Sequence, residues 1–337
     1  MSTTLIFGAG AIGQWLGALL HTSGSDVQIH VRPRVRQAID EVGGIALNNS
    51  KPVKVRLSST LEEIRNQHYK TVICTVKTYA VESALKDLKL AKVKFDEMVS
   101  FQNGWGTDQK YFSVFPDAKL WTLTTTRAVG IEQPGRLTPT TKGGLAVAPW
   151  SSGVRGIPQC LRRVTIPLVI LERALDLKWS KLLLNLIGNA SGAVTGLSPK
   201  QLATHSRLMK TELLLAREAI AVGNAMGVRR SDLPGFPVRV LSTALEKMPL
   251  RLVAPMIAAK MKGARGDKLP SLFFDLEDST RPTEIDSLNG AVVVEGESAG
   301  VPTPKQAALV HLFHRCRDDQ ELWSLLQKEP IRMLEYV

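Results

Sequence analysis

The sequence predicts an α/β domain followed by an all-helical domain, and two patterns lead to this prediction. From the N-terminus to Leu120, short β-rich runs alternate with longer helical stretches, which is typical of a parallel sheet covered by helices. After Glu172 the strand signals nearly disappear, and apolar residues recur three and four positions apart. A chain of 337 residues is long enough for about two domains. We therefore expect one domain over residues 1–173 and a second over residues 174–337.

Each expected element rests on a run of one kind. The strand candidates are Thr4–Phe7, Val27–Val31, Val72–Val76 and Met98–Phe101, with helices expected at Ala11–Leu20 and Tyr79–Leu88. From Leu120 to Val169, strands broken by Gly and Pro, including the turn Gln133-Pro134-Gly135, predict antiparallel strands at the sheet edge. The second domain has four helix candidates: Leu177–Val194, Ser206–Met226 (with Gly227 as its cap), Val238–Lys247 and Thr283–Ser298.

Charge and cysteine content narrow the class of protein. The chain has 43 Lys and Arg against 31 Asp and Glu, a net charge of +12, which favours a nucleic acid, a membrane surface or a small anionic molecule as partner. Its 44% hydrophobic and 22% charged residues argue against a disordered or fibrous chain. Three scattered cysteines, no apolar run of about 18 residues and no leader-like N-terminus predict a soluble cytoplasmic protein.

A glycine-rich turn follows the first expected strand. The segment Gly8-Ala9-Gly10-Ala11-Ile12-Gly13 has the spacing G-x-G-x-x-G and opens the first helix. Its first glycine permits a tight turn, its second lets the backbone approach a pyrophosphate, and its third lets the helix lie close to the sheet. Phosphate charge then meets the helix N-terminus. We expect a Rossmann-type dinucleotide-binding domain, with a purely structural turn as the alternative.

The residue after the second strand indicates which dinucleotide binds. An NAD site usually has an acid there for the ribose 2′-hydroxyl, whereas this chain has Val31-Arg32-Pro33-Arg34-Val35-Arg36. A guanidinium binds a 2′-phosphate through two hydrogen bonds, whereas a carboxylate would repel that phosphate. The sequence therefore predicts NADP(H), bound by Arg32 with Arg34 and Arg36 as possible helpers. The alternative is a solvated basic loop.

Lys77 and Asn103 each follow an expected strand of the sheet. In open α/β sheets the ligand crevice lies at the carboxyl ends of the strands, so both side chains are placed to touch the nicotinamide end or a substrate. Each could instead cap a helix or lie in solvent.

A polar stripe on an apolar helix is the main feature of the second half. Lys181, Asn185 and Asn189 recur every fourth residue, which places them on one line with a drift of about 40° per step. Leucine and isoleucine surround them, and a lysine in such surroundings needs a partner. The stripe is expected to line a cavity, the alternative being that neighbouring backbone satisfies it. Further on, Glu284 and Asp286 lie near an expected helix start, where the helix dipole alone would favour acids.

Taken together, these motifs make the chain resemble the ketopantoate reductase (2-dehydropantoate 2-reductase) family. The matching motifs are the glycine turn with its arginine, Val76-Lys77-Thr78, Gln102-Asn103-Gly104, the Lys181-Asn185-Asn189 series, the segment Thr283–Gly290 and the closing Ala299–Pro304. The resemblance runs from end to end. It implies reduction of ketopantoate to (R)-pantoate by NADPH, on the route to pantothenate and coenzyme A. It also implies an all-α C-terminal domain like that of 6-phosphogluconate dehydrogenase.

The resemblance also assigns roles to residues. The family's general acid falls on Lys181, and Glu284 lies where a glutamate stands beside the cofactor and this lysine. The substrate-binding positions match Asn103, Lys181, Asn185, Asn189 and Ser271. The cofactor positions match the residues Gly8 to Gly13, Arg32, Lys77, Asn103, Ala128 and Glu284. The chain departs from the family mainly on the substrate side, at Arg127, Ala190-Ser191-Gly192 and Pro270-Ser271.

Other functions remain open at this point. Another branched 2-oxo acid is an alternative substrate, and a non-catalytic NADPH-binding regulator is a second alternative. No zinc-finger spacing, RNA-recognition motif or long basic run supports a nucleic-acid partner, so a small anionic 2-oxo acid is the expected one. His311, His314 and Cys316 have no convincing further ligands, and no metal is expected. The oligomeric state is not readable from the residues, and the resemblance implies a monomer or a homodimer.

Overall fold

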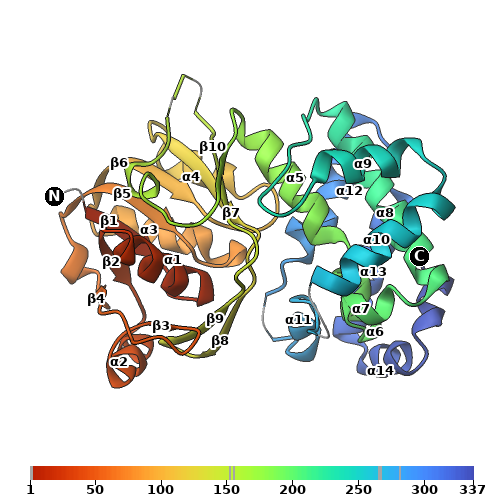
Figure 1. The fold of residues 1–337 in the computed structure, drawn as a ribbon, viewed down its shortest axis with the longest axis horizontal. Helices are drawn as coiled ribbons and strands as arrows, with labels where there is room; N and C mark the ends of the chain where they lie inside the picture. Colours follow the sequence, from red (N-terminus) through yellow and green to blue (C-terminus); the bar gives the residue numbers. More distant parts are fainter. Residues whose placement is uncertain (1–2, 152, 155, 265–267, 281) are drawn as a thin grey trace. The chain divides into compact units, whose positions relative to one another are not determined.

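The strands of the N-terminal half build a twisted sheet in the computed structural model, which describes residues 3–151, 153–154, 156–264, 268–280 and 282–337 (Figure 1). Eight strands of the described residues form it, in the spatial order β11 (Leu168–Ile170), β10 (Leu145–Pro149), β7 (Leu120–Thr125), β6 (Lys94–Ser100), β5 (His68–Cys74), β1 (Thr3–Phe7), β2 (Asp26–His30) and β4 (Arg56–Ser58). From β4 to β7 all neighbours pair parallel, whereas β10 is antiparallel to β7. The predicted parallel sheet with an antiparallel edge is confirmed.

The expected turn at Gln133-Pro134-Gly135 also forms a hairpin, but outside this sheet. It joins β8 (Val129–Gln133) to β9 (Arg136–Pro139), which pair antiparallel. Strand β9 also pairs with β3 (Ala46–Leu47), in parallel. The three strands make a small separate sheet among the described residues. The sequence predicts these strands at the edge of the main sheet. That prediction is wrong for the hairpin, which lies in the separate sheet.

Alternating side chains of the strands explain why helices cover both faces of the main sheet. On β1, Leu5 and Phe7 enter one apolar cluster and Ile6 enters another. The first cluster contains residues of α3 (Val81–Leu90), and the second contains Trp15 and Leu16 of α1 (Ala11–Thr22). Because successive strand residues point to opposite faces, burial of the whole run requires a helix on each side. Two further helices of this half are α2 (Pro33–Val42) and α4 (Asp108–Val114).

Two compact units divide the chain. Unit 1 comprises Met1–Gln102, Gly106–Lys178 and Leu233–Phe236, and unit 2 comprises Asn103–Trp105, Trp179–Asp232 and Pro237–Val337. The division falls inside α5 (Ala174–Leu186). The short segment Asn103–Trp105, although early in the sequence, packs with unit 2.

Helices make up unit 2, as the periodicity predicts. They are the later part of α5, then α6 (Ala190–Thr195), α7 (Pro199–Leu202), α8 (Ser206–Ala225), α9 (Val238–Lys247), α10 (Leu250–Ala264), α11 (Phe273–Glu277), α12 (Asn289–Ala299), α13 (Pro304–Asp318) and α14 (Gln320–Lys328). The expected helix bounds hold for α9, and α8 ends one residue early, with Gly227 in the left-handed conformation after it (φ +69°).

Two expected helices are each broken in the structure. The segment Leu177–Val194 is not one helix, because Gly188 adopts φ +68° between α5 and α6. The segment Thr283–Ser298 divides into a 3₁₀ turn, η4 (Ile285–Ser287), and α12, with Leu288 in a non-helical conformation (φ −107°, ψ −93°). A glycine inside a helical pattern is tolerated often enough that the pattern alone did not reveal the first break.

Candidate active site

The glycine turn lies at the carboxyl end of β1, beside the end of β5, where the strand order reverses. Gly8 has φ +116°, which favours glycine. A Cβ at Gly13 would lie 2.0 Å from the carbonyl oxygen of Gly8, so only glycine lets α1 start this close to the turn. A Cβ at Gly10 would meet no described atom within 4 Å, which leaves the backbone there open. This geometry fits the approach of a pyrophosphate to the N-terminus of α1.

The arginines after β2 differ in their surroundings. Arg32 and Arg34 are exposed at the start of α2, with Pro33 as its first residue. The Arg36 guanidinium instead donates to the Glu63 carboxylate (2.9 Å) and to the Ser59 hydroxyl (3.2 Å). Arg36 is therefore paired with an acid. Compared with Arg36, the exposed Arg32 is better placed to bind a phosphate.

Two further predicted cofactor residues lie in unit 1. Lys77 is exposed and directly precedes the 3₁₀ turn η2 (Thr78–Ala80), close behind the end of β5. Ala128 is exposed, and its backbone N–H donates to the Thr140 hydroxyl (3.1 Å) while its carbonyl accepts from the Thr140 N–H (2.8 Å). The carbonyl oxygen of Ala128 has a second lone pair for a ligand.

Unit 2 brings Asn103 to the helix that carries Lys181 and Asn185. The Asn185 amide is buried and donates to the Asn103 side-chain oxygen at 3.5 Å. Lys181, one turn earlier on α5, is half-buried. The Asn103 loop is fixed by Trp105, whose backbone N–H donates to the Ser287 carbonyl (2.8 Å). Two residues 82 positions apart in the sequence thus meet in one polar group.

Asn189 departs from the predicted stripe, because α5 ends before it. It is the N-cap residue directly before α6, so the three side chains do not share one helix. Asn189 is nevertheless buried, and its side-chain oxygen accepts from the Leu272 N–H (3.4 Å) and the Ser271 hydroxyl (3.5 Å). The structure therefore brings Asn189 and Ser271 together across 82 positions of sequence.

Glu284 is buried at the start of η4. Its backbone N–H donates to the Asp275 carboxylate (3.2 Å), which also accepts from the Thr283 hydroxyl (3.1 Å). The Ser287 hydroxyl donates to the Glu284 carbonyl (2.9 Å). These bonds fix the backbone that carries Glu284 rather than its carboxylate.

Two family descriptions cover most of the chain. Residues 4–152 match "Ketopantoate reductase PanE/ApbA", and residues 173–317 match "Ketopantoate reductase PanE/ApbA C terminal". The chain belongs to the ketopantoate reductase family. The resemblance that the motifs carried is thereby confirmed, together with the fold class.

Among its relatives is the 2-dehydropantoate 2-reductase of Pyrococcus horikoshii, which is 23% identical over 89% of this chain and 92% of the relative. A crystal structure of a PanE/ApbA family ketopantoate reductase from Ralstonia eutropha JMP134 has a TM-score of 0.75 at 24% identity, over 95% of this chain and 99% of that chain. A D-mandelate dehydrogenase with NADH and anilino(oxo)acetate has a TM-score of 0.76 at 21% identity, over 94% and 98%. These two structures share the fold of this ketopantoate reductase family member.

Four polar side chains that hold this arrangement escaped sequence reasoning. The buried Gln14 bridges the glycine turn, donating to the Ala9 carbonyl (2.7 Å) and accepting from the Gly135 N–H (2.8 Å). The Thr75 hydroxyl donates to the Gly8 carbonyl (2.7 Å). The remaining two are Gln102, which donates to the Cys74 and Val76 carbonyls, and Asp275. Gln102, next to Asn103, could have been suspected from the Gln102-Asn103-Gly104 motif; the others have no local signal.

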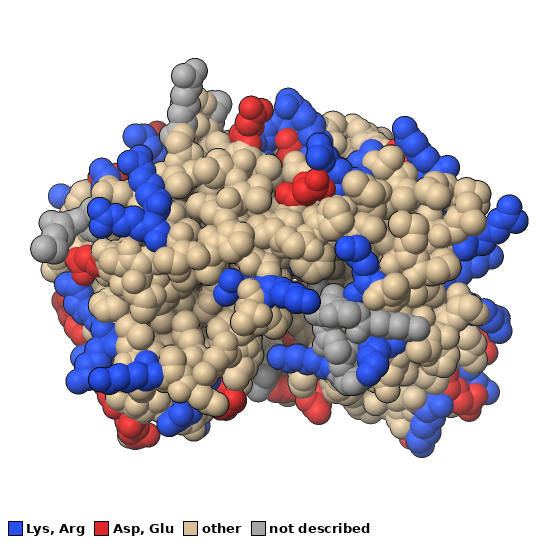
Figure 2. Space-filling view, viewed as in Figure 1, with Lys and Arg blue, Asp and Glu red and all other residues tan. Residues whose placement is uncertain are grey.

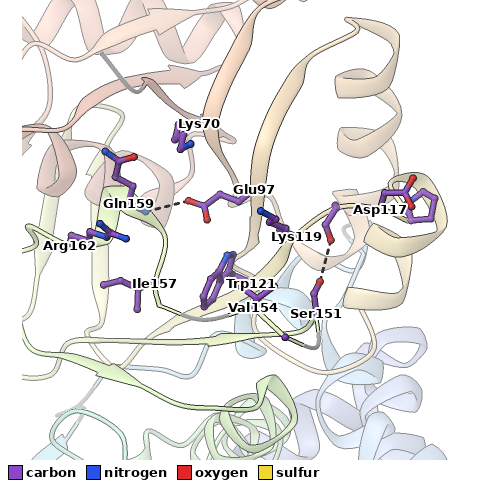
Figure 3. Close-up of a pocket in the computed structure, with 13 residues that line it drawn as sticks. Lys70, Glu97, Asp117, Lys119, Trp121, Ser151, Val154, Ile157, Gln159 and Arg162 are labelled. Carbon is purple, nitrogen blue, oxygen red and sulfur yellow. Dashed lines mark hydrogen bonds between the residues drawn. The ribbon is translucent and has the colours of Figure 1, made fainter.

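A pocket of unit 1 is lined by none of these residues. It has a volume of about 700 Å³, and most of its lining comes from the segment before β7 and the segment after β10 (Figure 3). Glu97, Lys119 and Trp121 line it, and Glu97 accepts from the Gln159 N–H at 3.3 Å. The glycine turn is at the opposite, carboxyl ends of the strands, so the pocket is not the dinucleotide site.

Two findings concern metals and membranes. No group of three or more metal-ligating side chains occurs among the described residues. His314 faces Asp286 (Nε2 to Oδ1, 2.9 Å), and Cys316 is buried. Of the helices in the described ranges, none has the length and hydropathy that a membrane span requires.

Proposed function

We propose that this protein reduces ketopantoate to (R)-pantoate with NADPH. Membership of the ketopantoate reductase family supports the proposal. The observation that carries it is the meeting of polar side chains in unit 2: Asn103 with Asn185, and Asn189 with Ser271. Neutral donors and acceptors of this kind suit the hydroxyl and carboxylate of a small 2-oxo acid.

NADP(H) is proposed to bind at the glycine turn of unit 1. The open backbone at Gly10 and the N-terminus of α1 suit the pyrophosphate, which the run from Gly8 through Ala9, Ala11 and Ile12 to Gly13 would contact. Arg32 would bind the 2′-phosphate and thereby select NADPH over NADH. Lys77, Asn103, the Ala128 backbone and Glu284 are proposed to contact the remainder of the cofactor. NADPH supplies the hydride that reduces the ketone carbon.

Lys181 is proposed as the general acid. Its ammonium would donate a hydrogen bond to the ketone oxygen and transfer a proton to it as negative charge develops there. Asn185, Asn189 and Ser271 would hold the substrate in place, and Glu284 would orient Lys181 or a cofactor hydroxyl. In this proposal residues 1–173 form the cofactor domain and residues 174–337 the substrate domain.

The proposed partners are the cofactor and a small anionic 2-oxo acid, with no nucleic acid or membrane involved. The oligomeric state is proposed as monomer or homodimer, and the location as cytoplasmic. The three cysteines, each free and buried, are compatible with a reducing compartment.

Oxidation of NADPH with a panel of 2-oxo acids tests the function. The panel contains ketopantoate, its shorter branched analogues and the oxo acid that corresponds to mandelate, with NADH in place of NADPH as control. We expect the highest kcat/KM for ketopantoate with NADPH. A higher value for another oxo acid would replace the substrate, and the absence of turnover with every oxo acid would refute the enzyme function.

The Lys181→Ala variant tests the general acid. Loss of a positioned acid typically costs about 10²–10⁴-fold in rate, so kcat for ketopantoate should fall by that range while NADPH still binds. Lys210→Ala removes an exposed lysine of α8 and serves as the matched control, with kcat unchanged. A kcat of Lys181→Ala near that of the parent would exclude the assignment.

A further inference from the structure

A buried carboxylate on α8 has no part in the proposed chemistry. Glu212 is 2% exposed and faces the junction of α5 and α6. An acid in the interior is costly unless hydrogen bonds satisfy its oxygens, so its partners indicate why it is there.

Each oxygen of Glu212 accepts one hydrogen bond from that junction. Oε2 accepts from the backbone N–H of Gly188 at 2.6 Å, and Oε1 accepts from the hydroxyl of Ser191. Gly188 is the left-handed residue that ends the α5 segment, and Ser191 lies in the first turn of α6. The Glu212 carboxylate therefore forms hydrogen bonds with the chain on both sides of Asn189.

These two hydrogen bonds bear on the direction of the Asn189 side chain. It has φ −92° and ψ −68° at the start of α6, and its side-chain oxygen faces the Leu272 N–H and the Ser271 hydroxyl at 3.4 and 3.5 Å. These bonds are long, so they do not fix Asn189 by themselves. The Asn189 carbonyl accepts from the Ala193 N–H (2.9 Å) within α6, and the residues on either side of Asn189, Gly188 and Ser191, are the ones that Glu212 holds.

We propose that Glu212 is a positioning residue for the substrate, which acts by holding Gly188 and Ser191 so that Asn189 points toward Ser271. The inference rests on the proposed function for the identity of the substrate.

Hydrogen-bond chemistry predicts which substitution of Glu212 preserves the contacts with Gly188 and Ser191. Glutamine retains an oxygen that accepts from the Gly188 N–H, and its NH₂ group donates to the Ser191 oxygen when the hydroxyl rotates. Burial raises the pKa of the Glu212 carboxyl, so a neutral side chain is tolerated there. Alanine leaves the Gly188 N–H and the Ser191 hydroxyl without their acceptors.

Steady-state kinetics of Glu212→Ala, Glu212→Gln, Ser191→Ala and Asn189→Ala test the proposal. Loss of one or two hydrogen bonds that orient Asn189 should raise KM for ketopantoate about tenfold in Glu212→Ala, with KM for NADPH within about twofold of the parent. Glu212→Gln should restore KM to within about threefold, and Ser191→Ala should be intermediate. In the Asn189→Ala background, Glu212→Ala should change KM for ketopantoate no further, because both act through the same side chain.

Several results would overturn the proposal. They are an unchanged KM for ketopantoate in folded Glu212→Ala, an equal rise in both KM values, and effects of Glu212→Ala and Asn189→Ala that multiply. Asp319→Ala, which removes the carboxylate cap of α14 in the same unit, is the control for a general loss of stability and should leave both KM values unchanged. If Glu212→Ala does not fold, Ser191→Ala alone decides, since it removes a single hydroxyl.

Amide hydrogen exchange separates this inference from the proposed function. Without any substrate, Glu212→Ala should lose protection at Gly188 and in the first turn of α6, whereas α14 keeps it. If the parent protein does not reduce ketopantoate but this local loss is seen, the proposed function is refuted and the role of Glu212 in holding Gly188 and Ser191 is supported. If the parent is active and Glu212→Ala changes neither exchange nor KM, that role of Glu212 is refuted.

Discussion

Two glycines of one turn separate folding from cofactor binding at the scale of a single residue. In Gly13→Ala the new Cβ would lie 2.0 Å from backbone, which cannot yield as a side chain does, so we expect a loss of about 1–3 kcal/mol in unfolding free energy. In Gly10→Ala the Cβ enters open space, so stability should be retained while the pyrophosphate is obstructed. Urea denaturation and titration with NADPH measure the two effects. Equal behaviour of the two variants would contradict the role of the turn.

Arg32 is expected to decide between the two nicotinamide cofactors. Removal of a charge-assisted pair to the 2′-phosphate costs about 1.5–3 kcal/mol, so KM for NADPH should rise about 10- to 100-fold in Arg32→Ala, with KM for NADH nearly unchanged. Arg36→Ala is the matched control, because its guanidinium is already bound by Glu63, and it should change neither value more than about twofold. A parallel rise for both cofactors in Arg32→Ala would show that Arg32 does not read the 2′-phosphate.

The buried Glu212 also predicts how stability depends on pH. Because burial raises the pKa of this carboxyl in the folded protein, the folded state binds a proton more readily than the unfolded chain. Its favourable contribution is therefore complete below the unfolded pKa and is lost as the pH rises through the folded pKa. Glutamine does not titrate, so the stability of Glu212→Gln relative to the parent should increase from pH 4 to pH 7. Denaturation at several pH values checks this, and a decrease would reverse the sign that burial implies.

At the scale of elements, local patterns located strands β1, β2, β5 and β6 and helices such as α1, α8 and α9. They did not locate α10, α13 or α14, nor the breaks within two of the expected helices. The run Leu177–Val194 is apolar and periodic throughout, and nothing within it distinguishes Gly188 from a tolerated helical glycine. The break is stabilised by Glu212, 24 residues further along the chain. The expected stripe is therefore wrong as a single helix: Lys181 and Asn185 lie on α5, and Asn189 is the N-cap of α6. Likewise, only tertiary contacts reveal that Asn103–Trp105 packs with unit 2.

The Asn103 loop offers a prediction at this scale. The Trp105 indole N–H donates to the Glu295 carboxylate (2.8 Å) on α12, and its ring packs edge-on against Trp179. Trp105→Phe keeps the aromatic packing but loses the hydrogen bond, so KM for ketopantoate should rise about fivefold as Asn103 loosens. Glu295→Gln retains an accepting oxygen and should stay near the parent. An unchanged KM in Trp105→Phe would show that the bond does not fix Asn103.

At the scale of the whole molecule, the feature with a physical consequence is the net positive charge of +12. On the face shown in Figure 2, Lys and Arg lie scattered among uncharged residues, without one continuous stripe. The sequence predicted the sign of the partners from the net charge of +12, but not where the excess lies. Several basic side chains have acidic partners nearby: Lys70 with Asp96, Arg56 with Asp26 and Lys86 with Glu82. Such exposed pairs contribute little to stability and cancel in the net charge. The excess of +12 therefore comes from the other basic residues and acts mainly through the long-range field.

That field should accelerate the encounter with an anionic substrate and cofactor. Since the Debye length shortens to about 10 Å at 0.1 M salt, kcat/KM for ketopantoate should fall as the salt concentration rises from about 10 to 150 mM, while kcat at saturation stays constant. Stopped-flow or steady-state rates across this range measure the slope. A neutral solute such as glucose at matched osmolarity is the control and should have no effect. A polyanion tests the competing explanation of the same charge: because the basic side chains form no continuous stripe on the face in Figure 2, duplex DNA should show no retardation at about 150 mM salt. Retention of DNA at that salt, together with a kcat/KM indifferent to it, would mean that the net charge serves a polymer and not the two small anions.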